Sequence, residues 1–166
     1  HTAFSSQFLQ AAGRAGTGLD KPYLSQAYLE ESIKICEKEG LWAYGANAKA
    51  TLAAVFAQRG DIKEAINLIE NVKSVDLGKN FDHKSKRFLL SRISSYEGKV
   101  YGLAKKYPES ERAYRNCIEI SIEMGQIDPF GISQVRKGLG EALLEQGRKK
   151  EALKEFEIVR EEFRKL

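Results

Sequence analysis

One spacing pattern recurs along this chain of 166 residues: a small residue, an alanine twelve positions later, then apolar residues four and seven positions further on. The clearest copy is Gly140, Ala152, Phe156 and Val159. A second copy is Ala53, Ala65, Ile69 and Val72. Steps of three and four residues place side chains on one face of an α-helix. The pattern therefore predicts helical hairpins, which must stack to bury their apolar faces.

Glycine and proline mark where the predicted helices end and begin. Glycines 40, 60, 125 and 147 follow apolar helical stretches, and prolines 22, 108 and 129 open later ones. Asp61 with Glu64, and Asp128, are predicted helix caps, and residues 76–82 are predicted to form a loop. No segment alternates with a period of two, so no strand is expected. The sequence predicts an all-α chain with helices at about residues 3–15, 22–39, 42–59, 61–75, 83–106, 108–124, 129–146 and 148–165.

These helices pair into about four antiparallel hairpins in one domain, residues 1–166, at about residues 3–40, 42–75, 83–124 and 129–165. The third hairpin keeps the alanine pattern through Ala113, although Tyr101 replaces the small residue. The first keeps Ala27, with the charged Glu31 and Lys34 at the later apolar positions. The four alanines are separated by 38, 48 and 39 residues.

This pattern resembles the tetratricopeptide repeat, and the long steps resemble the subset found in MalT-like regulators. Residues 32–40 and residues 117–125 are similar to each other in sequence, and both resemble segments of that subset. The resemblance implies a right-handed superhelix, a TPR-like solenoid, whose first helices line a concave face. It also implies a protein that holds other proteins.

The long step between Ala65 and Ala113 requires extra chain. We expect the helix at about 83–106 to be some two turns longer than its counterparts and to project roughly 10 Å at 1.5 Å per residue. The projecting end carries Lys84, Lys86 and Arg87 beside Phe88. We expect a second contact site there, for an acidic partner or for another domain of the parent protein.

Catalytic chemistry finds little support in the sequence. The two histidines are His1 and His83, and no nucleophile–base set or paired carboxylates can be assembled around them. Residues 13–18 are rich in glycine but lack the ending of a phosphate-binding loop. We expect a non-enzyme without catalytic residues, metal or cofactor.

The two cysteines, Cys36 and Cys117, both fall on apolar helical faces and are expected to be buried free thiols. Free thiols favour a reducing compartment, so a cytoplasmic location is expected. No run of 18 apolar residues suggests a membrane span. The chain begins with His-Thr, which suggests a tag remnant on a fragment of a larger protein.

Residues 79–106 hold eight basic and two acidic residues with aromatic residues between them. We define the basic patch as Lys84, Lys86, Arg87 and Arg92. The wider cluster adds Lys79, Lys99, Lys105 and Lys106, with Phe81, Phe88, Tyr96 and Tyr101. Such a cluster can bind an acidic protein segment or nucleic acid, or form a solvated face with its aromatic rings in the core. Nucleic acid is the less favoured partner.

The concave face predicted by the resemblance lacks the Lys, Asn and Arg clamp with which some repeat proteins hold chaperone C-termini. Small residues stand there instead, including Gly98 and Gly102, which suggests either an open groove or close helix packing. The candidate groove residues are Asn47, Ala50, Ala54, Gln58, Lys99, Lys137 and Glu141.

Three functions follow as hypotheses. The first is a non-catalytic scaffold that holds a peptide or helix in its groove. The second is an effector- or inhibitor-sensing domain of a MalT-like signalling ATPase or transcription regulator. The third is nucleic-acid binding through the basic patch. The sequence leaves the partner and the oligomeric state open.

Overall fold

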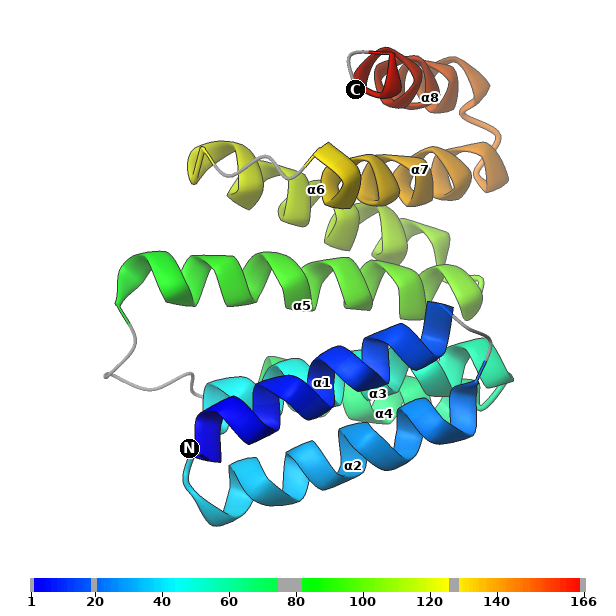
Figure 1. Ribbon diagram of the computed structural model, residues 1–166. Helices are drawn as coiled ribbons and strands as arrows, with labels where there is room; N and C mark the ends of the chain where they lie inside the picture. The colour runs from blue at the N-terminus through cyan, green and yellow to red at the C-terminus, as the bar shows by residue number, and fades with distance from the viewer. Residues whose placement is uncertain (1, 19–20, 75–81, 126–128, 165–166) are drawn as a thin grey trace. The chain divides into compact units, whose positions relative to one another are not determined.

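The computed structural model describes residues 2–18, 21–74, 82–125 and 129–164. These residues form eight α-helices and no strand (Figure 1), so the predicted all-α class is confirmed. Most of the predicted loop at 76–82 and the predicted cap Asp128 lie outside the described residues. The helices are α1 (Thr2–Gly18), α2 (Pro22–Lys38), α3 (Trp42–Arg59), α4 (Ile62–Lys73), α5 (His83–Leu103), α6 (Tyr107–Glu123), α7 (Pro129–Glu145) and α8 (Lys149–Phe163).

Helices end at glycines and begin at prolines where the sequence predicted. Gly60 and Gly147 have φ angles of 92° and 77°, a left-handed conformation that favours glycine and ends a helix. Pro22 and Pro108 lie in the first turns of α2 and α6. Asp61 is the N-cap residue of α4, as predicted, but the expected capping hydrogen bond is wrong, because its side chain makes none. Asp61 instead pairs with Arg59 at 3.0 Å.

The chain divides into two compact units, residues 1–82 (unit 1) and 83–166 (unit 2). Unit 1 contains the hairpins α1–α2 and α3–α4, with α2 also packed against α3. Unit 2 contains the hairpins α5–α6 and α7–α8, with α6 and α5 packed against α7. Each unit therefore holds two of the four predicted hairpins.

Small residues allow the two helices of a hairpin to approach closely. In the last hairpin, a Cβ added at Gly140 would lie 2.5 Å from the ring of Phe156. A Cβ at Gly13 would lie 2.7 Å from Leu29, and one at Gly98 would lie 2.6 Å from the ring of Tyr114. Close packing, the alternative considered for Gly98, is therefore what the structure shows.

The recurring alanines mark buried positions in three of the four hairpins. Ala65, Ala113 and Ala152 are almost inaccessible to solvent. Ala27 is exposed, so its assignment as the crossing alanine of the first hairpin is wrong. Leu29 and Ser25 make the contacts with α1 instead. Burial, not residue type, identifies the crossing position.

The helix predicted over about 83–106 is shorter than expected. α5 has 21 residues, against 17, 18 and 17 in α1, α3 and α7. The excess is about one turn rather than two, because Lys105 adopts a left-handed φ of 58° after the helix ends at Leu103. Arg87 also pairs with Glu123 in the last turn of α6. The expected 10 Å projection is therefore wrong, since α6 reaches as far as Arg87.

Candidate binding site

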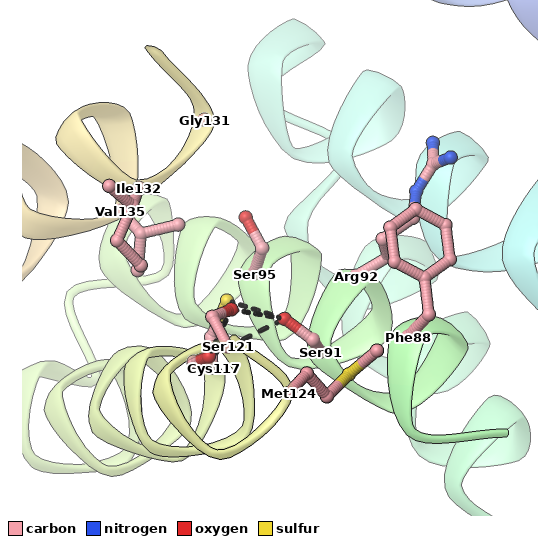
Figure 2. Close-up of a pocket in the computed structure, with 10 residues that line it drawn as sticks. All are labelled: Phe88, Ser91, Arg92, Ser95, Cys117, Ser121, Met124, Gly131, Ile132 and Val135. Carbon is pink, nitrogen blue, oxygen red and sulfur yellow. Dashed lines mark hydrogen bonds between the residues drawn. The ribbon is translucent and has the colours of Figure 1, made fainter. Parts of the chain in front are cut away.

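A pocket of about 280 Å³ lies within unit 2 between α5, α6 and α7. In Figure 2, Phe88 and Arg92 stand on one side and Ile132 and Val135 on the other, with serines and a cysteine between them. Apolar groups make up much of the wall. The described residues that line it are Phe88, Ser91, Arg92, Ser95, Cys117, Ser121, Met124, Gly131, Ile132 and Val135.

The polar floor of the pocket is tied together by hydrogen bonds. The hydroxyls of Ser91 and Ser121 are 2.9 Å apart, and the Ser91 hydroxyl is 3.4 Å from the Sγ of Cys117. Ser121 donates to the carbonyl of Cys117 at 2.8 Å. Burial raises the pKa of the Cys117 thiol more than the serine hydrogen bonds lower it. The thiol is therefore protonated near neutral pH and is a poor nucleophile.

Arg92 stands at the rim of the pocket, and its guanidinium points away from the floor (Figure 2). Its guanidinium carbon lies 5.8 Å from the centre of the Phe88 ring, a cation–π contact. No carboxylate of the described residues pairs with Arg92, and none lines the pocket. The rim thus carries an uncompensated positive charge next to apolar walls.

The same arrangement of contacts occurs in unit 1, at positions 85 residues earlier in the sequence. Ser6 corresponds to Ser91, and Leu29 corresponds to Tyr114. Ser6 contacts Ser32 and Cys36, both at 2.9 Å, as Ser91 contacts Cys117 and Ser121. The contact between Gly13 and Leu29 matches the contact between Gly98 and the ring of Tyr114 in the third hairpin. The two units are therefore variations on one local structure.

In unit 1 a glutamine occupies the place that corresponds to the pocket. Gln10, which corresponds to Ser95, is 2% exposed. Its side-chain amide donates to the hydroxyls of Ser6 and Ser32 and to the carbonyl of Tyr44, each at 3.2 Å. Asn47 donates to its Oε1 at 2.5 Å. The shorter Ser95 leaves this space unfilled in unit 2.

The predicted groove residues do not form one open surface. Asn47, Ala50 and Ala54 are buried in α3, and Asn47 is held by Gln10, so their assignment to an open groove is wrong. Gln58, on the same helix, is exposed. In unit 2, Lys137 and Glu141 are exposed and pair with each other at 3.6 Å on α7. The small side chains of α3 pack instead of lining an open groove.

The basic cluster is divided among several environments. Lys84 and Lys86 are exposed, Arg87 is paired with Glu123, and Arg92 lies at the pocket rim. Burial lowers the pKa of Lys99. Lys106 lies over the ring of Tyr101, and Lys79 and Phe81 lie outside the described residues. The cluster is therefore not one continuous cationic surface.

Other chemistry is sparse in the described part of the chain. His83 is exposed at the start of α5, away from the residues that line the pocket. No group of three or more His, Cys, Asp or Glu side chains among the described residues could hold a metal ion. None of the described helices is both long and apolar enough to cross a membrane.

Sequence reasoning missed the pocket, although a signal for the hydrogen-bonded serines and cysteine of its floor was present. Each cysteine has a serine four residues away on its own helix, Ser32 before Cys36 and Ser121 after Cys117. Both cysteines are buried free thiols, as expected. The repetition of small polar groups on two otherwise apolar faces indicated a shared polar floor.

No family model matches this sequence. No curated protein matches it either. Among solved structures, the fold is similar to the crystal structure of BtubC (BKLC) from P. vanneervenii, with a TM-score of 0.73 and 16% sequence identity. The match covers 98% of this chain and 64% of that one, so this chain spans less than two thirds of its neighbour. At this identity the likeness shows the fold alone, an all-helical chain of hairpins.

Proposed function

We propose that this chain is a non-catalytic interaction module that binds a short peptide or helical segment of a partner protein. The pocket of unit 2 is the single observation that carries the proposal. Its walls are apolar, and its rim holds Arg92, which pairs with no carboxylate of the described residues. Binding sites commonly combine apolar walls with a few placed polar groups.

The chemistry of the lining favours binding over catalysis. No histidine or carboxylate occurs among the described residues that line the pocket, so no general base faces a substrate there. The one thiol is buried and its pKa is raised. The serine hydroxyls at 91 and 121 bond to each other rather than to a base.

We also propose that the chain is a tetratricopeptide-like repeat protein, as the resemblance implies. Four hairpins with closely packed small residues, as at Gly140 and Phe156, support membership in that class of repeat. We further propose that its hairpins form a right-handed superhelix and that the protein is cytoplasmic. The buried free thiols of Cys36 and Cys117 support a reducing compartment.

A screen of short random peptides displayed on phage, against the purified chain, tests the function. We expect selected peptides to bind and to shift the backbone amide resonances of Ser91, Met124 and Ile132 in the ¹⁵N-labelled protein. Pocket-filling Val135→Trp should weaken binding, whereas Gln134→Trp, an exposed neighbour on α7, should not. The function is wrong if no peptide is selected, or if all selected peptides shift resonances in unit 1 only.

A further inference from the structure

We propose that the unit 2 pocket receives one apolar side chain from an acidic segment of the partner protein, with Arg92 binding a carboxylate beside it. The inference rests on the proposed function and specifies the chemistry of the partner. It also assigns binding to unit 2 alone, because unit 1 fills the corresponding space with its own side chain.

The apolar part of the ligand follows from the walls. Phe88 lines the pocket and is 48% exposed, and Met124, Ile132 and Val135 line the same space. The serine hydroxyls at 91 and 121 are already bonded to each other. An apolar side chain of the size of leucine, methionine or phenylalanine can cover these walls while the Ser91 and Ser121 hydroxyls stay bonded to each other.

The acidic part of the ligand follows from the charges at the rim. Lys84, Phe88 and Arg92 are spaced four residues apart, so they lie in a row along one face of α5. Lys84 is exposed, and neither it nor Arg92 is paired with a carboxylate of the described residues. Arg87 is paired with Glu123 and contributes no free charge. Two uncompensated cations beside an apolar pocket complement a segment that carries acidic residues next to its apolar anchor.

Unit 1 shows how the chain itself closes such a space. Gln10 reaches the serine pair of α1 and α2 and the carbonyl at the start of α3, and it is held by Asn47. Gly60 and Gly147 end the corresponding helices α3 and α7 and are 87 residues apart. The same offset aligns Tyr44 of α3 with Gly131 of α7, which lines the unit 2 pocket. Two large side chains of unit 1 are thus replaced by Ser95 and Gly131 in unit 2. A glutamine at position 95 should therefore close the pocket from inside.

Two pools of short synthetic peptides test the inference. Both have a central leucine, methionine or phenylalanine, which is flanked by glutamate in one pool and by lysine in the other. We expect the glutamate pool to bind and to shift the amide resonances of Ser91, Ser95 and Ile132, and the lysine pool not to bind. Ser95→Gln should weaken binding by about tenfold or more, the scale of losing a central anchor. Binding should also weaken as salt rises.

Matched variants separate the rim charge from general charge. Arg92→Gln should weaken binding about threefold at low salt, whereas Lys86→Gln, an equal change of charge off the row, should leave it nearly unchanged. Phe88→Ala serves as a second pocket variant, because the Phe88 ring is 48% exposed and is not part of the buried core. Circular dichroism and thermal melting of each variant check the fold.

Three results overturn the inference. The first is equal binding of the lysine pool, and the second is full binding by folded Ser95→Gln and Phe88→Ala. The third is a footprint outside the pocket. If phage selection yields neutral or basic peptides that bind in the pocket, the proposed function stands and this inference fails. If no peptide binds and a small carboxylate such as hexanoate does, both fail, because the site then serves a small effector.

Discussion

The ring of Tyr114 on α6 packs directly over Gly98 on α5, so that a Cβ at position 98 would lie 2.6 Å from a ring atom. Gly138 on α7 approaches the other end of the same ring, where an added Cβ would lie 2.5 Å from Cζ. Burial raises the pKa of the Tyr114 phenol. One tyrosine thus joins three helices of unit 2.

Gly98→Ala should destabilise the fold by about 1–3 kcal/mol, the usual cost of overpacking, measured by chemical denaturation. Gly102→Ala is the matched control. A Cβ at position 102 would lie 3.3 Å from the Ser110 hydroxyl, without a ring in its way. Replacing glycine by alanine within a helix raises stability by up to about 1 kcal/mol, which offsets this close contact. Equal stabilities of the two variants would show that the ring moves aside freely.

Ala152→Leu should lower stability by about 1–3 kcal/mol, because the alanine is buried within the last hairpin. Ala27→Leu, at the exposed position first assigned to the same role, should change stability by less than about 0.5 kcal/mol. Melting temperatures compare the two variants. An unchanged melting temperature for Ala152→Leu would contradict the crossing position.

Gln10→Ala should cost about 1–3 kcal/mol, since it leaves the buried Asn47 amide and the Tyr44 carbonyl without this partner. Gln7→Ala, on the exposed face of the same helix, should be nearly neutral. Urea denaturation measures both. Equal stability of the two variants would show that the amide contributes no net stability.

Glu111 makes stability depend on pH below its ordinary pKa of 4.5. Burial raises the pKa of Glu111, but hydrogen bonds from Gln146, Arg148 and Arg115 outweigh burial and leave the pKa lowered. The unfolded chain therefore binds this proton first, and the stabilisation is present above the ordinary pKa and lost as pH falls through the folded pKa.

We expect Glu111→Gln to lose less stability than the parent chain between about pH 5 and about pH 3. Glu119→Gln, an exposed position on the same helix, is the control and should follow the parent chain. Thermal melts across this range measure the slope. Identical slopes for Glu111→Gln and the parent would contradict the lowered pKa.

The double change Lys84→Glu and Lys86→Glu should leave the melting temperature nearly unchanged, because both side chains are exposed. Adding Arg87→Glu should lower stability by up to about 1 kcal/mol, since it removes the pair with Glu123 and sets two carboxylates together. A large loss from the double change alone would show that these lysines support the fold.

Local sequence signals determined the helices of this protein. Glycines such as Gly60 and Gly147 end helices because a left-handed residue costs glycine little, and prolines open them because their φ is already helical. Periodic apolar residues marked the buried alanines Ala65, Ala113 and Ala152. These signals act within one or two turns of chain, which is why they can be read without the fold.

The tertiary structure alone decided which residues meet across each hairpin. Ala27 matched the pattern but is exposed, because the contacts between α1 and α2 place Leu29 and Ser25 at the interface. Asn47 was assigned to a groove but is held inside by Gln10. The pocket lies at a meeting of three helices, where Ser95 and Gly131 stand in place of the larger Gln10 and Tyr44 of unit 1. Periodicity reports the face of a helix, whereas a cavity is set by side-chain volumes brought together from distant segments.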